Sequence, residues 1–126
     1  MQDDGRPVFL NLFQIRLPLP GIVSIAHRIS GMLLFFALPL FLFLLMVSLR
    51  DEEGFDWVQG LLSAPLFSIV LVLVFWSFWH HLLGGIRFLL LDLELGLDKK
   101  SSQMSAGLVL VMSVVAAILS LAGVLL

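Results

Sequence analysis

The sequence predicts an all-α integral membrane protein with three transmembrane helices. Its 126 residues are 60% hydrophobic and 13% charged, and the mean hydropathy is +1.11, a composition typical of membrane proteins. Three long apolar stretches carry at most one charged residue each. We expect these stretches, at about residues 22–49, 58–91 and 104–126, to cross a hydrocarbon core of about 30 Å as helices.

The composition also excludes several kinds of protein. The chain contains no cysteine, so it supplies no disulfide, no thiolate-bound iron–sulfur cluster and no c-type haem attachment. The formal net charge of −2, without a basic stripe, argues against nucleic acid as a partner. Asp3 and Asp4 stand where a cleavable signal peptide carries positive charge, so we expect no such peptide.

We expect two parts, an N-terminal segment of residues 1–21 and a three-helix membrane domain of residues 22–126. The first segment mixes apolar and polar residues and ends in Pro18, Pro20 and Gly21, which break a continuing helix. A segment of this kind is expected to lie in the headgroup layer on the cytoplasmic side.

Prolines and serines mark details of the three spans. The first span has 28 residues, about 42 Å of helix, and Pro39 inside it predicts a kink. Pro65 is expected in the first turns of the second span, where proline costs little. Ser101 or Ser102 can cap the third helix, whose small residues allow close helix packing.

The positive charges predict the orientation of the three helices. With three spans, the N-terminus and the second loop share one side of the membrane, and the first loop and the C-terminus share the other. Six positive residues fall on the first side and only Arg50 on the second, which predicts a cytoplasmic N-terminus and a periplasmic C-terminus. The six are Arg6, Arg16, Arg28, Arg87, Lys99 and Lys100.

The first span opens with a polar group of residues inside an otherwise apolar run. Ser24, His27, Arg28 and Gly31 are spaced i, i+3, i+4 and i+7, so a helix presents them along one stripe. An ionisable group at such a depth is a candidate functional residue. A hydroxyl, an imidazole and a guanidinium are therefore expected to face one partner.

The second span contains two adjacent histidines that cannot face the same partner, because neighbours on a helix differ by about 100°. His81 is followed one turn later by Gly84 and Gly85, which leave room beside the imidazole for a large flat ligand. His80 has bulkier neighbours and is expected to be less accessible. His81 and His27 lie at similar depths in the cytoplasmic half of the membrane, about 9 Å and about 7.5 Å from the ends of their apolar runs.

A b-type haem fits this arrangement, with His81 as an axial ligand of the iron. His27 and Arg28 would then lie near the haem propionates or beside a second ligand. Either Ser77 or the backbone carbonyl at i−4 could accept the other N–H of His81 and fix its tautomer. Each feature alone has a simpler explanation. A single intramembrane histidine often only links helices, an arginine can reach the headgroups, and paired glycines can pack helices. Only their co-location on one side favours the haem.

Two stretches resemble the large cytochrome b subunit of bacterial succinate dehydrogenase, the membrane anchor of respiratory complex II. The first runs from Arg6-Pro7-Val8 to Ser24-x-x-His27-Arg28-x-Ser30-Gly31. The second is His81-x-x-x-Gly85-Ile86-Arg87-Phe88, with Asp92 following. The third span is generic, and Phe88 stands where many relatives have a second histidine.

The resemblance implies an anchor in the bacterial inner membrane that pairs with a second, smaller anchor subunit and binds haem b. A flavoprotein subunit and an iron–sulfur subunit would dock on the cytoplasmic face. By this analogy Ser24 and Arg28 line the ubiquinone site, His81 is one axial ligand of the haem iron, and the partner anchor supplies the other. His27 and Arg28 would lie near the propionates.

The chemistry expected of Ser24 and Arg28 is stabilisation of charge. A quinone carbonyl gains negative charge on reduction, and a fixed cation with a hydroxyl donor stabilises that charge better than water does in a site of low dielectric constant. The succinate-oxidising site lies outside this chain. Two alternatives remain open at this point: the anchor of a quinol:fumarate reductase, and a redox-inert transmembrane scaffold.

Overall fold

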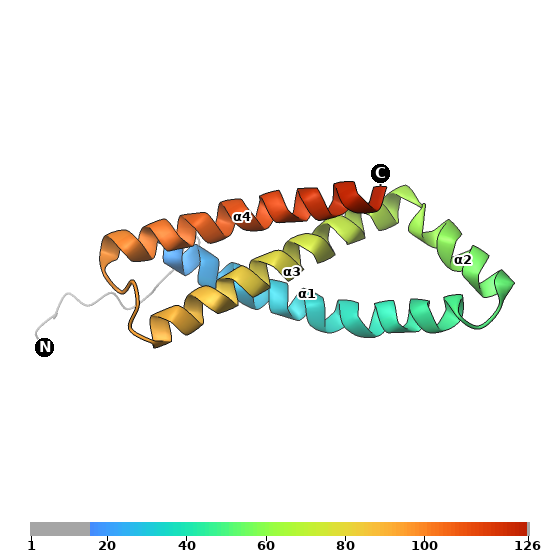
Figure 1. Cartoon of the computed structure of the whole chain (residues 1–126), viewed down its shortest axis with the longest axis horizontal. Helices are drawn as coiled ribbons and strands as arrows, with labels where there is room; N and C mark the ends of the chain where they lie inside the picture. Colours follow the sequence, from blue (N-terminus) through green and yellow to red (C-terminus); the bar gives the residue numbers. More distant parts are fainter. Residues whose placement is uncertain (1–15, 126) are drawn as a thin grey trace, which may run out of the picture.

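The structure, a computed structural model, describes residues 16–125, and four helices make up most of this part of the chain (Figure 1). They are α1 (Leu19–Ser48), α2 (Glu52–Leu62), α3 (Pro65–Asp92) and α4 (Lys99–Leu125). The helices α1 and α3 and residues Lys99–Val124 of α4 are long and apolar enough to cross a membrane. The all-α class and the three spans predicted from the sequence are therefore confirmed.

Helix α1 begins three residues earlier than expected. Pro18 is extended, with φ −66° and ψ 156°, and Pro20 lies in the first turn of the helix. Proline lacks an N–H, but the first amides of a helix have no intrahelical acceptor, so Pro20 costs nothing there. Pro39 lies inside the continuous helix, and the kink expected at Pro39 remains a prediction.

The second span begins later than expected, because the stretch predicted as one span from residue 58 to 91 forms two helices. The acidic loop is the start of α2: Asp51 Oδ1 accepts the Gly54 amide at 2.7 Å, which caps this helix. The Arg50 side chain and the Gly54 amide both lower the pKa of Asp51. A break at residues 63–64 separates α2 from α3, which begins at Pro65, a residue suited to a helix start.

The connection between α3 and α4 also differs from the expected one. Glu94 and Gly96 adopt positive φ angles of 62° and 75°, which turn the chain after α3. Asp98 Oδ2 accepts the amide of Ser101 at 2.9 Å, so Asp98 caps α4 and neither Ser101 nor Ser102 does. The hydrogen bonds from Ser101 lower the pKa of the Asp98 carboxyl.

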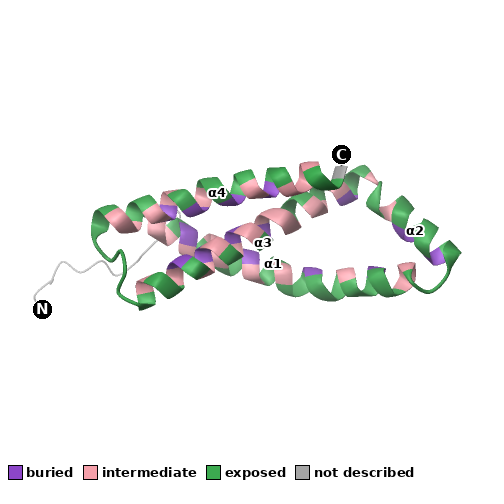
Figure 2. Ribbon diagram, in the orientation of Figure 1, coloured by how far each residue is buried: buried purple, intermediate pink, exposed green. Residues whose placement is uncertain are grey.

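Helix α3 packs against both other long helices. It crosses α1 and then diverges from it toward α2, while α4 runs along its other side (Figure 1). Small buried clusters hold the two ends, Val23 with Ala106 and Val109 at one and Leu44 with Val58 and Phe67 at the other. The outer faces of the helices are exposed (Figure 2) and rich in large apolar side chains, as expected for surfaces that meet lipid or other membrane subunits.

Candidate functional site

The site is built where α1 crosses α3, and its centre is a pair of imidazoles. The rings of His27 on α1 and His81 on α3 are stacked, with centroids 4.1 Å apart and planes 10° apart. The edge of Phe88 meets His27 at a centroid distance of 5.1 Å. The structure thus brings together the two histidines that the sequence placed at similar depth.

The backbone of α1 fixes the tautomer of His81. The Nδ1 atom of His81 lies 3.1 Å from the carbonyl oxygen of His27. A carbonyl oxygen can only accept, so Nδ1 carries the proton and Nε2 keeps its lone pair when the ring is neutral. No hydrogen bond within residues 16–125 occupies this Nε2, and His81 as a residue is half-buried.

Two serines lie near the imidazole pair or one turn from it. Ser77 was one of two candidate acceptors for the N–H of His81, with the backbone carbonyl at i−4, but its Oγ is buried and has no partner among the described residues. The acceptor for the N–H of His81 is instead the carbonyl oxygen of His27 on α1. Ser30, which is fully buried, donates to the same His27 carbonyl at 2.8 Å and lies 3.4 Å from His81 Nδ1.

Glycines allow the two rings to approach. A Cβ on Gly31 would lie 2.9 Å from Cε1 of His81, and one on Gly84 would lie 3.0 Å from Cδ2 of His27. Gly85 is less tight, at 3.5 Å from Nε2 of His27. The glycines after His81 therefore make room for the His27 ring, whereas the sequence interpretation had assigned that room to a flat ligand.

The structure does not bring Arg28 to His81. Arg28 is exposed and Ser24 half-buried, whereas Val23 and Ser30 of the same helix are buried. At about 100° per residue, Arg28 points away from the face that packs on α3 and α4. The predicted stripe is thus divided: His27 and Gly31 contact α3, while within residues 16–125 Arg28 is exposed and Ser24 is half-buried.

His80 lies inside the helix bundle, and its Nε2 atom is buried without a partner among the described residues. It is fully buried, its Nδ1 lies 3.3 Å from the hydroxyl of Ser113 on α4, and its ring stacks on Trp76 at 5.2 Å. This placement agrees with the expectation that His80 is less accessible than His81.

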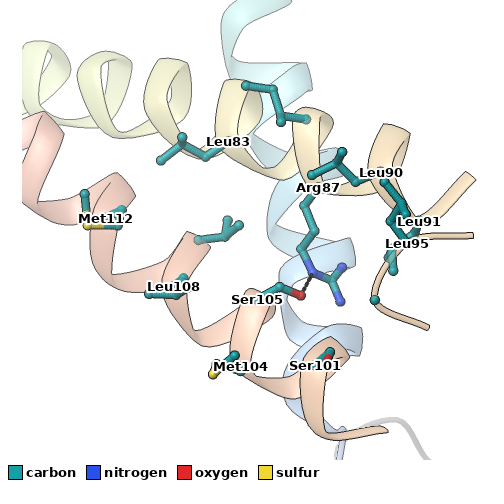
Figure 3. A pocket seen from close by; sticks show the side chains of 13 residues that line it. Leu83, Arg87, Leu90, Leu91, Leu95, Ser101, Met104, Ser105, Leu108 and Met112 are labelled. Atoms are coloured by element: carbon teal, nitrogen blue, oxygen red, sulfur yellow. Dashed lines mark hydrogen bonds between the residues drawn. The ribbon is translucent and has the colours of Figure 1, made fainter. Parts of the chain in front are cut away.

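Serines on α4 form a polar row that was not predicted from the sequence. Ser120 Oγ accepts the indole N–H of Trp79 at 2.8 Å. Arg87 Nε donates to Ser105 Oγ at 3.0 Å (Figure 3). Its Nη2 donates to the carbonyl and hydroxyl oxygens of Ser102, each at 3.1 Å. Ser102, Ser105, Ser113 and Ser120 follow one another at intervals of three, eight and seven residues. These intervals place the four serines on one face of a helix, so their spacing in the sequence could have predicted that polar face.

Three candidate spans, with paired imidazoles held between two of them, define a multi-pass membrane protein with a polar site in its interior. The chain belongs to the succinate dehydrogenase/fumarate reductase transmembrane subunit family, whose profile matches residues 2–120.

Individual relatives align with the chain over most of their lengths. The succinate dehydrogenase cytochrome b556 subunit of Paracoccus denitrificans is 33% identical over 117 residues, which cover 93% of this chain and 90% of the relative. The subunit of the same name from Coxiella burnetii is 34% identical over 116 residues, or 91% and 93% of the two chains. That of Rickettsia felis is 29% identical over 109 residues, or 86% and 85%.

Proposed function

We propose that this chain is the membrane anchor of a succinate:quinone oxidoreductase, in which it helps to hold haem b and forms part of the ubiquinone-reducing site. The observation that carries the proposal is the hydrogen bond between His81 Nδ1 and the His27 carbonyl, which leaves Nε2 as the ligating nitrogen. The relatives are named cytochrome b556 subunits, and this name supports a b-type haem.

The residues present fit a haem. His81 would ligate the iron through Nε2, held in one orientation by a backbone acceptor, as is usual for metal-bound histidine. His27 Nε2 is buried and has no partner within residues 16–125, so a propionate of the haem or a group of another subunit would complete its hydrogen bonding. When bound, the haem supplies a one-electron carrier near the quinone site. The second axial ligand would come from the partner anchor.

Ser24 and Arg28 are proposed to bind the quinone. Within residues 16–125 Arg28 is exposed and Ser24 is half-buried, so other subunits would complete the site around them. The guanidinium and the hydroxyl of these residues would donate to a quinone carbonyl oxygen and stabilise its growing negative charge. Since this chain contains no tyrosine, any phenolic donor must come from a partner.

The exposed helix faces support further subunits. We propose a second small anchor subunit against these faces, with an iron–sulfur subunit and a flavoprotein subunit on the cytoplasmic side of the inner membrane. The proposed domain division, residues 1–21 as an interfacial segment and 22–126 as the membrane domain, belongs to this arrangement. Most of the first segment lies outside the described residues, and the N-terminus is proposed to be cytoplasmic on the basis of charge.

Purification of the tagged chain from membranes tests the proposal. We expect three other proteins, including a flavoprotein, to co-purify with it in detergent. The reduced-minus-oxidised spectrum should show b-type Soret and α bands, and succinate should reduce ubiquinone. A complex that oxidises quinol with fumarate faster than it performs the reverse reaction would favour the second activity in the family name. A complex without haem bands would favour a redox-inert scaffold.

A further inference from the structure

Arg87 is a buried cation without a counter-charge among residues 16–125. Its side chain lies between α3 and α4 (Figure 3), and only 5% of the residue is exposed. Its hydrogen-bond partners are neutral serine oxygens, and no carboxylate of residues 16–125 forms an ion pair with it. Asp92, Glu94 and Asp98 near this end of the helices are all exposed. A buried charge left unpaired is costly, and more so beside lipid.

The guanidinium borders a cavity of about 440 Å³ between α3 and α4. Most of the cavity wall is aliphatic, including Leu83, Leu90, Leu108 and Met112, whereas Arg87 and two serines supply its polar groups (Figure 3). Leu108 and Met112 are also exposed at the molecular surface, so the cavity communicates with the exterior of the helix pair.

Arg87 lies near the end of α3 that leads into the connection with α4. Arg87 lies five residues before the last residue of α3, or about 7.5 Å below the helix end. Lys99 and Lys100 form the first turn of α4 at the same end, and basic residues near the membrane surface attract anionic lipid.

We propose that this cavity binds an anionic phospholipid. The phosphate accepts a hydrogen bond from Nη1 of Arg87, which donates to no oxygen of the described residues. One acyl chain lies along the aliphatic wall formed by Leu83, Leu90 and Leu108. A free phosphate leaves that wall uncovered, and a zwitterionic lipid leaves the charge of Arg87 without net compensation.

This site is separate from the proposed haem ligand. His81 pairs with the backbone of α1, whereas Arg87 pairs with serines of α4. A variant can therefore lose lipid binding and keep haem ligation, or lose haem ligation and keep lipid binding.

Native mass spectrometry of the complex purified in detergent tests the proposal. The probes are phosphatidylglycerol and phosphatidylcholine with identical acyl chains. The unaltered complex should retain phosphatidylglycerol about tenfold more strongly, because hydrogen bonds to charged groups are the stronger ones. Arg87→Gln should abolish this preference, whereas Arg50→Gln, which alters an exposed arginine paired with Asp51, should keep it.

A second variant tests the cavity without a change of charge. Leu108→Trp fills the cavity and should lower retention of phosphatidylglycerol, while Leu119→Trp, on an exposed part of α4 outside the cavity, should not. The comparison of Leu108→Trp with Leu119→Trp tests lipid binding even if the complex with Arg87→Gln fails to assemble. Equal retention of the two lipids, or unchanged retention in Leu108→Trp, overturns the proposal. A shifted haem spectrum in Arg87→Gln with its lipid preference intact also overturns it, because the counter-charge would then be a propionate.

Discussion

The imidazole of His81 donates from Nδ1 to the backbone carbonyl of His27, 3.1 Å away on another helix. The two rings also stack at 4.1 Å. Helix α1 therefore sets both the orientation and the tautomer of a side chain on α3. A change in how these helices cross should alter the chemistry of His81, even when His81 itself is untouched.

Gly31→Ala tests this dependence. The added Cβ would lie 2.9 Å from Cε1 and 3.2 Å from Nδ1 of His81, so the ring or the helix must move. We expect a destabilisation of about 1–3 kcal/mol and a weakened or shifted haem absorption, measured by thermal unfolding and difference spectroscopy. Gly123→Ala is the control, because nothing lies within 4 Å of a Cβ at that position. Identical spectra and stability for both variants would contradict the proposed packing.

Ser113→Ala tests the structural role of His80. The substitution removes the hydroxyl 3.3 Å from His80 Nδ1 and leaves a buried nitrogen without that partner. We expect the complex to lose about 0.5–2 kcal/mol of stability, with the position of the haem bands unchanged. Ser48→Ala is the matched control, since that hydroxyl bonds only to Leu45 of its own helix. A spectral shift in Ser113→Ala would place His80 near the haem instead.

Arg28→Leu and Ser24→Ala test the proposed quinone contacts. Both variants should reduce ubiquinone at least about tenfold more slowly, because they remove donors to the charge on the carbonyl oxygen. Succinate oxidation by an artificial acceptor, which bypasses the quinone, should persist. Arg50→Leu, an exposed arginine at the other end of α1, should affect neither activity. Parallel loss of both activities in Arg28→Leu would count against a quinone contact.

Topology reporters test the orientation predicted from charge. A reporter active only in the periplasm should work when fused after residue 126 and fail when inserted between residues 93 and 98, the connection from α3 to α4. The reverse pattern would place the proposed site in the outer half of the membrane and remove the route from a cytoplasmic iron–sulfur subunit.

The sequence predicted the long helices well because lipid imposes a strong constraint on composition. A membrane-crossing helix must be apolar along its length, so the few polar residues, His27 and His81 among them, were the candidates for a site. The similar depths of these two histidines followed from counting residues along two helices, and their contact in the structure agrees with that count.

Contacts that depend on the rotation and crossing of helices could not be predicted in the same way. Local spacing offered two acceptors for His81 on its own helix, Ser77 and the backbone carbonyl at i−4, but the crossing with α1 supplies the His27 carbonyl instead. The serines that surround Arg87 became meaningful only once α3 and α4 were placed side by side. Pro65 is tolerated either within the first turns of a longer helix or at the start of a new one, so the sequence alone could not separate α2 from α3.

The most direct test of the account is the reduced-minus-oxidised spectrum of the purified complex carrying His81→Ala, compared with His80→Ala. We predict that His81→Ala loses or strongly shifts the b-type bands, because it removes the Nε2 ligand, while His80→Ala keeps them at their normal positions. Unchanged bands in His81→Ala, or their loss in His80→Ala alone, would contradict the assignment of His81 as the haem ligand.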